Sequence, residues 1–153
     1  QKYVYIQSPY LLPTEPILLA LKTADVAGVD VRIMIPEKSD SRMVHWGTMS
    51  YLQELMEAGI KIYMYQKGFL HSKLIVCDDC LSSVGSTNMD FRSFEHNFEI
   101  NAFMYDKTSA LMLKDIFLSD QKDAKLLHLK EWRMRPWSQK VKESVIRLFA
   151  PLL

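Results

Sequence analysis

The chain has 153 residues, 48% of them hydrophobic, and a formal net charge of only +1. This length and apolar content fit one domain, residues 1–153, with a core of its own. No run of about 18 uncharged apolar residues occurs, which excludes an ordinary membrane-spanning helix. The near-neutral charge argues against a nucleic-acid binder. Because the chain starts directly in a strand-like pattern, we expect it to be a piece of a longer protein.

The first 65 residues alternate between strand and helix patterns. The expected strands cover residues 4–7, 29–35 and 60–65, and the helices between them end at Gly28 and Gly59. Strands that alternate with helices predict parallel pairing through right-handed crossovers. We therefore expect an α/β fold.

The next block changes the pattern from helix and strand to successive strands. His71 to Cys77 alternates like a strand, Asp78-Asp79 has turn chemistry, and residues 80–84 form the expected returning strand. A further alternating run covers residues 97–102. The sheet should therefore be mixed. We expect a helix over 109–118 and a polar loop over 120–125.

Polar side chains with catalytic potential concentrate in this block. In a strand, His71 and Lys73 share one face. Ser86 and Asn88 follow in a short loop after Gly85, and Glu99 lies on the next alternating run. Three successive segments are thus expected to direct these groups into one pocket.

These residue types suit attack on a phosphodiester, whose anionic oxygens repel nucleophiles. Lys73 supplies a fixed positive charge, and Ser86 and Asn88 supply neutral hydrogen bonds to the phosphate. This set takes the role that a metal holds in other phosphoryl-transfer sites. His71 is the group suited to nucleophilic or acid–base work near neutral pH. Glu99 is expected to accept from its other ring nitrogen, as in a catalytic triad.

The spacing H-x-K-x4-D-x6-G-S-x-N is met without a gap from His71 to Asn88. It resembles the HKD signature of the phospholipase D superfamily. Residues 88–101 are similar to bacterial cardiolipin synthases, and specifically to their second HKD half, as are residues 7–13 and 68–71. The resemblance covers nearly the whole chain. It implies a phospholipase D-like α-β-α sandwich, with a mixed β-sheet flanked by helices, as one half of a longer two-HKD enzyme.

The resemblance also implies a reaction, phosphatidyl transfer that converts two phosphatidylglycerols into cardiolipin and glycerol without a cofactor. One histidine forms a phosphohistidine, and the histidine of the paired motif protonates the leaving group. As part of a second motif, His71 would be the general acid and then the base. Asp78 belongs to the motif, and the resemblance gives it a supporting role.

The partners implied are a phospholipid substrate, an anionic membrane surface and a second HKD half, in the same chain or in a homodimer. The implied location is a bacterial cell membrane, with this piece itself soluble. Two alternatives stay open. One is a single-HKD phosphodiesterase or nuclease that acts as a homodimer, and the other is a non-catalytic phosphate-binding half-domain.

The last 33 residues are basic, with eight Lys or Arg against three Asp or Glu, whereas residues 1–120 hold eleven against fifteen. Residues 136–153 form an expected amphipathic helix with one apolar stripe. Its apolar residues are Val141, Val145, Leu148, Phe149 and Leu152. The stripe fits either an interfacial membrane helix or a terminal helix packed on protein.

No metal site is expected. Cys77 and Cys80 form a lone C-x2-C pair, whereas structural zinc requires four ligands. The remaining histidines are scattered, and their spacing does not suit a metal. We expect both cysteines to be packing residues beside a tight turn.

Overall fold

The computed structural model describes residues 2–152 and contains a mixed seven-stranded sheet in the order β8-β6-β5-β1-β3-β4-β9. Its strands are β1 (Tyr3–Gln7), β3 (Asp30–Pro36), β4 (Lys61–Tyr65), β5 (Leu74–Cys77), β6 (Leu81–Gly85), β8 (Asn101–Met104) and β9 (Ala124–Leu126). The β1, β3 and β4 strands are parallel, while β5, β6, β8 and β9 each pair antiparallel with their neighbours. The expected α/β fold with a mixed sheet is confirmed.

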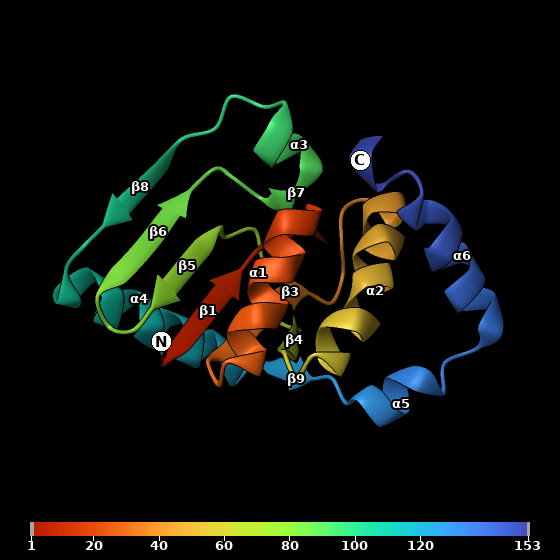
Figure 1. Ribbon diagram of the computed structural model, residues 1–153, viewed down its shortest axis with the longest axis horizontal. Coiled ribbons are helices and arrows are strands. Elements are labelled where there is room, and N and C mark those ends of the chain that lie inside the picture. The colour runs from red at the N-terminus through yellow and green to blue at the C-terminus, as the bar shows by residue number, and fades with distance from the viewer. Residues whose placement is uncertain (1, 153) are drawn as a thin grey trace.

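Helices cover both faces of this sheet (Figure 1). The crossover helices α1 (Glu15–Val26) and α2 (Arg42–Glu57) pack on one face, and α4 (Lys107–Gln121) packs across the other. Each interface encloses its own apolar core. The α-β-α layering predicted from the sequence is therefore present.

Short elements complete the chain. A small second sheet pairs β2 (Leu11–Leu12) with β7 (Met89–Asp90), and α3 (Phe91–Glu95) follows directly. The C-terminal segment forms α5 (Leu129–Arg133), α6 (Trp137–Arg147) and the 3₁₀ turn η1 (Ala150–Leu152). Both α5 and α6 pack along α2, and η1 packs against α3.

The connection between β5 and β6 has three residues, 78–80, with Cys77 opposite Leu81, and the Cys80 N–H donates to the Cys77 carbonyl oxygen at 3.2 Å. Asp78 and Asp79 have φ angles of 54° and 55°. Two successive left-handed residues are the requirement of a type I′ turn, which aspartate tolerates better than most residues. The turn expected at Asp78-Asp79 is thus confirmed, with Cys77 and Cys80 on either side of it as free thiols.

Four expected boundaries were wrong. The amphipathic helix expected over 136–153 covers only Trp137–Arg147, is followed by the 3₁₀ turn η1, and its expected last residue lies outside the described residues. The strand expected from His71 begins only at Leu74, and the run expected from residue 97 forms a strand only from Asn101. The expected loop at 120–125 instead contains the end of α4 and the start of β9. β9 pairs with the free edge of β4, so its conformation comes from tertiary pairing that a local pattern does not show.

Candidate active site

His71 and Lys73 lie in the extended segment that immediately precedes β5. Because β5 is antiparallel to β1, with Leu74 opposite Gln7, this segment lies beside the C-terminal end of β1. The Lys73 ammonium lies 3.0 Å from His71 Nε2 and donates to the His71 carbonyl oxygen at 3.0 Å. The expected meeting of these two side chains is observed, although no strand carries them.

The Lys73 ammonium is partly buried and lies near several acidic side chains. Partial burial lowers the pKa of Lys73 below its ordinary value, whereas the negative charges of Glu99, Asp90 and Asp40 oppose that shift. An ammonium has three N–H donors. Two of them are directed at His71, so one remains for an anionic ligand.

Ser86 fixes the approach of the segment after β6 to the segment before β8. Its backbone N–H donates to the Ile100 carbonyl at 2.9 Å, and the Ile100 N–H donates to Ser86 Oγ at 3.0 Å. The Ser86 hydroxyl also donates to the Glu99 carboxylate. This close pairing requires Gly85, because a Cβ there would lie 1.9 Å from Asn101 Oδ1 and 2.3 Å from the Ile100 oxygen.

The structure does not support the triad-like role expected for Glu99. The Glu99 side chain accepts hydrogen bonds from Ser86 and from Asn97 Nδ2, the latter at 3.1 Å, and not from His71. The hydrogen bond from Ser86 lowers the pKa of Glu99, with a smaller contribution from Asn97. The loop between α3 and β8 therefore orients the carboxylate toward Ser86, so it acts on Lys73 only through its charge.

Asn88 lies beside α3. Its backbone N–H donates to Ser93 Oγ at 3.2 Å. Within residues 2–152, its side-chain oxygen is buried and has no hydrogen-bond partner. Because the unpartnered atom is an oxygen, which only accepts hydrogen bonds, the phosphate contact expected for Asn88 would have to come from its Nδ2 group.

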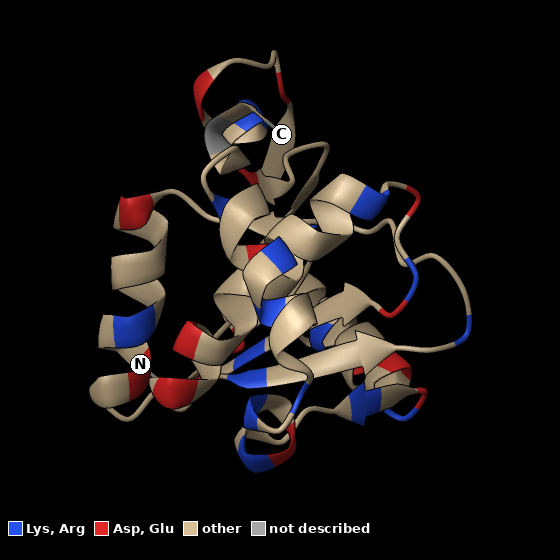
Figure 2. Cartoon of the chain, turned by 90° about the vertical axis from the view of Figure 1, so that its right-hand side faces the viewer, with Lys and Arg blue, Asp and Glu red and all other residues tan. Residues whose placement is uncertain are grey.

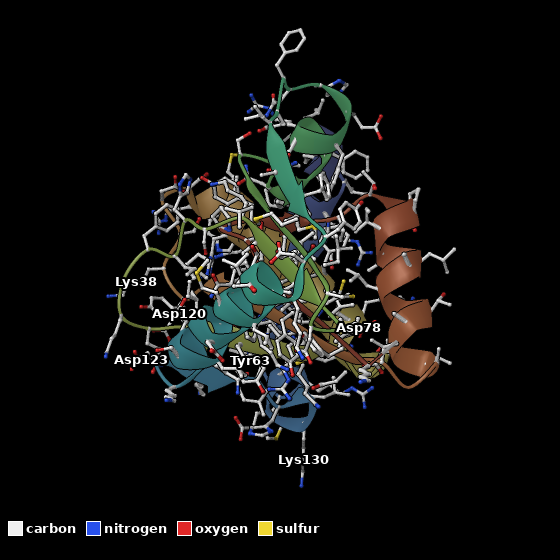
Figure 3. The ribbon with its side chains drawn as sticks, turned by 90° about the vertical axis from the view of Figure 1, so that its left-hand side faces the viewer. Lys38, Tyr63, Asp78, Asp120, Asp123 and Lys130 are labelled. Atoms are coloured by element: carbon white, nitrogen blue, oxygen red, sulfur yellow. The ribbon has the colours of Figure 1, made fainter. Side chains whose placement is uncertain are left out.

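Asp78 lies at the opposite end of β5 from His71 and Lys73. Its carboxylate accepts the backbone N–H groups of Lys2 and Tyr3 at 2.7 and 3.0 Å. Figure 3 shows Asp78 and Asp120 on opposite sides of the molecule. Asp78 thus fastens the β5–β6 turn to the start of β1 and does not touch the site.

Sequence reasoning missed a hydrogen-bonded chain behind the site. Ser72 Oγ donates to Gln7 Oε1 at 2.7 Å, and Gln7 Nε2 donates to Asp120 Oδ2 at 2.8 Å. Gln7 is only 1% exposed. The sequence signal that could have revealed this chain of hydrogen bonds was a polar residue, Gln7, at the end of an expected buried strand. This chain ties the His71–Lys73 segment to β1 and α4.

The site opens into a surface cavity of about 580 Å³. Phe69, His71 and Lys73 line it, with Gly85 and Asp120 at its other walls. The Phe69 ring lies 5.4 Å from the imidazole of His71, centroid to centroid. Among the described residues, no group of three or more His, Cys, Asp or Glu could hold a metal ion.

Solved structures share this fold. A phosphatidylserine synthase from Haemophilus influenzae Rd KW20 matches with a TM-score of 0.77 and 18% identity, over 100% of this chain and 42% of that one. Nuc, a phospholipase D family member from Salmonella typhimurium, matches with a TM-score of 0.70 and 22% identity, over 83% and 82%. The fold is that of a phospholipase D-like domain.

Residues 1–121 match the family model described as "Cardiolipin synthase, PLD-like domain". Cardiolipin synthase 1 of Staphylococcus epidermidis is 48% identical over 153 residues, which are 100% of this chain and 31% of that protein. The cardiolipin synthase of a Geobacillus strain is 49% identical over 100% of this chain and 30% of its own length. This chain belongs to the cardiolipin synthase family of phospholipase D-like domains.

The chain spans about a third of the length of these relatives. Within residues 2–152, no helix combines the length and the hydropathy that crossing a membrane would need.

Proposed function

We propose that this chain is the part of a cardiolipin synthase that carries its second HKD motif. The reaction is phosphatidyl transfer between two phosphatidylglycerols, which yields cardiolipin and glycerol. The observation that carries the proposal is the contact of His71 with Lys73 at a surface cavity that Gly85, the residue before Ser86, also lines. The 48% identity to a cardiolipin synthase supports the choice of reaction within the family.

In the first step, the histidine of the other motif attacks phosphorus, and a P–N bond forms as the P–O bond to glycerol breaks. His71 gives its proton to the departing glycerol oxygen. In the second step, the terminal hydroxyl of another phosphatidylglycerol attacks the phosphohistidine. His71 takes the hydroxyl proton, the P–N bond breaks, and cardiolipin is released.

Lys73, Ser86 and Asn88 have binding and charge-stabilising roles in this mechanism. The third N–H of Lys73 is directed at a non-bridging phosphate oxygen, where charge accumulates in the transition state. The Nδ2 group of Asn88 supplies a further hydrogen bond to the phosphate. Glu99 balances the charge of Lys73 and positions Ser86, and Asp78 is a structural residue of the motif.

A second HKD half is the partner that completes the site. Large apolar side chains from the α3–β8 loop to the residue after β8 remain exposed, which is unusual for a surface without a partner. Their exposed fractions are 107% for Phe98, 80% for Ile100, 60% for Phe103 and 79% for Tyr105. The length of the relatives supports a second half within the same chain. The site then works on membrane phospholipid at a bacterial cell membrane.

The test replaces His71 in the full-length enzyme. His71→Ala should lower kcat at least ~10³-fold, because it removes the acid and base of both steps. His128→Ala is the matched control, because His128 also precedes a Lys by two residues, yet it lies at the start of α5 without a side-chain cap bond. Retention of more than a tenth of the wild-type activity by His71→Ala would refute the proposal.

A further inference from the structure

The last long helix, α6, is docked onto α2 through its charged face. Glu143 is only 6% exposed, and its carboxylate accepts two hydrogen bonds from the Arg135 guanidinium, at 2.6 and 2.9 Å. Arg147 Nη2 donates to Glu54 at 2.7 Å, and its guanidinium lies 4.2 Å from the centre of the Tyr51 ring. These contacts fix the rotation of α6 about its axis.

This orientation turns the apolar stripe of α6 away from the protein. At 100° per residue, the stripe lies on the side of the helix away from Glu143 and Arg147. The exposed fractions along it are 78% for Trp137, 39% for Val141, 48% for Val145, 79% for Leu148 and 77% for Leu152. A helix packed by its polar face with its apolar face in solvent reverses the usual pattern of a surface helix. The packing of the helix covers half or more of Val141, Val145 and Phe149, the last 47% exposed, but it does not account for the largely exposed Trp137, Leu148 and Leu152.

The charges beside the stripe are positive. Lys140 and Lys142 lie on its two borders, each about 100° of rotation from its centre. Glu143 is the one acidic residue between 137 and 152, and it is buried against Arg135. Lys142 is exposed with its ammonium 5.9 Å from the centre of the Trp46 ring, while the half-buried Lys140 donates to the Arg133 carbonyl oxygen at 2.6 Å, so the stripe is bordered by lysines and by no exposed carboxylate. Figure 2 views the molecule from the side on which α6 lies.

We propose that the outward stripe of α6 is a lipid-contacting surface that lies flat in the interface of an anionic membrane. Lysines at both borders of an apolar stripe match anionic headgroups above buried acyl chains. Trp137 at the start of the stripe has the amphipathic ring that favours this depth. A partner protein would need acidic groups on both sides of its own apolar patch, whereas an anionic bilayer has that charge everywhere.

The position of the stripe suits a lipid enzyme. Its C-terminal end continues into η1, which packs against α3, the helix beside Asn88 (Figure 1). The C-terminal end of the stripe would thus hold the membrane beside α3, where Ser93 accepts from the Asn88 backbone N–H. The relevance of this position rests on the proposed function, whereas the binding itself does not.

Co-sedimentation of the 153-residue chain with vesicles tests the surface. Vesicles of phosphatidylglycerol and phosphatidylcholine should bind the chain, and pure phosphatidylcholine should bind it at least about five-fold more weakly. Added salt should weaken the binding to anionic vesicles. Lys142→Gln should reduce it about five-fold, because each lysine near such a surface contributes about 1 kcal/mol.

The apolar component is tested with the double variant Trp137→Ser/Leu148→Ser, which should lose at least about ten-fold in binding. Leu19→Ser is the matched control, because Leu19 is 66% exposed on α1, and it should bind as the wild type. Tryptophan emission should shift to the blue on binding, and Trp137→Phe should remove most of that shift.

Three outcomes would overturn the proposal. They are equal binding to neutral and anionic vesicles, equal loss in the control and the double variant, and a dimer in solution that the double variant dissociates. The last would assign the stripe to a second copy of the chain. The vesicle assay is separate from catalysis, because His71→Ala should bind vesicles as the wild type does. Binding without transferase activity in the full-length enzyme would therefore reject only the proposed function.

Discussion

At the scale of single residues, the site places one ammonium among several acids. The carboxylates of Glu99, Asp90 and Asp40 all raise the pKa of Lys73, although burial has the larger effect and lowers it. Asp40 is itself held in place by the Tyr10 hydroxyl, at 2.8 and 3.0 Å. The negative charges of these acids therefore favour the protonated form of the partly buried Lys73, which can then bind an anionic phosphate.

Glu99→Gln tests this electrostatic role. Removing the negative charge should lower the pKa of Lys73 further, so the basic limb of the pH–rate profile should move to lower pH. We expect kcat to fall about ten-fold, because Ser86 also loses its charged acceptor. The measurement is kcat against pH in the full-length enzyme.

Asn97→Ala is the matched control, because it removes the hydrogen bond from Asn97 to Glu99 but leaves the carboxylate charge. Its basic limb should stay in place. A shift of the acid limb alone in Glu99→Gln would instead point to an action on His71, as in a triad.

The sequence predicted which side chains lie near one another better than their contacts. Spacing placed His71 and Lys73 side by side, although the strand expected to carry them begins only at Leu74, and Ser86 and Asn88 lie on the predicted loop. The contact of Glu99 depends on the loop after α3, which has no periodicity to read. The Gln7–Asp120 bond joins residues 113 positions apart, and no local pattern contains that information.

At the scale of elements, the contact between the Ser86 loop and β8 depends on the absence of a side chain at Gly85. Gly85→Ala should separate β6 from β8 and destabilise the fold by about 1–3 kcal/mol, as overpacking does. The check is the free energy of unfolding in urea.

Adding Asn101→Ala should not rescue that variant. It removes the closest clashing atom, but the backbone oxygen of Ile100 remains 2.3 Å from the new Cβ. Full recovery of stability in the double variant would show that the strand backbones are not in tight contact.

The C-terminal helix shows why periodicity alone could not decide its role. The stripe predicted over 136–153 is real, but α6 ends at Arg147, and its contacts with α2 use charged side chains. The hydrophobic pattern predicted that one face is apolar. The direction of that face was set by Arg135 and Glu54, which lie outside α6.

The ion pairs of Glu54 should make the docking of α6 sensitive to acid. Burial raises the pKa of Glu54, but hydrogen bonds from Arg147 and Lys22 outweigh it and hold the pKa below the ordinary value. For a lowered pKa, the stabilisation is present above the unfolded-state value, and it is lost as pH falls through the folded-state value. Glu54→Gln should therefore destabilise the protein near pH 7 by about 0.5–1 kcal/mol, and the difference should fade toward pH 3.

Hydrogen exchange assigns the effect to the helix. The amides of residues 137–147 should exchange about two- to five-fold faster in Glu54→Gln at pH 7. Glu57→Gln removes the partner of Arg133, which lies on α5, and should leave α6 unchanged. Equal acceleration in both variants would mean that α6 is not held by Glu54.

At the scale of the whole molecule, the place of His71 in the fold explains why we expect one domain of this kind to supply only half of the proposed active site. The His71 segment lies at the end of the central strands, where β1 ends and β5 begins, and the cavity there is open to solvent. In-line displacement at phosphorus needs a group on each side, one that attacks and one that protonates the leaving oxygen. The described residues provide His71 on one side, and Phe98 and Ile100, which flank Glu99 in the chain, are exposed.

The last prediction follows from this stoichiometry. The H-x-K spacing recurs at His128, but Arg135 stands near the position of the motif aspartate, and no Gly-Ser-x-Asn follows. We therefore expect the 153-residue chain to have no phosphatidyltransferase activity as a monomer. Activity should require the other half, or a homodimer in which two His71 side chains meet across a two-fold axis. The experiment measures specific activity against protein concentration together with the molar mass in solution.

The two routes to a complete site give different curves. A homodimer should gain specific activity with concentration as its molar mass doubles, and mixing with an excess of His71→Ala should suppress it. A site completed only by the other half should stay inactive at every concentration and recover when the full-length enzyme is made. Turnover by a confirmed monomer would contradict the two-histidine mechanism, because His71 would then have to attack phosphorus and protonate the leaving group from one side.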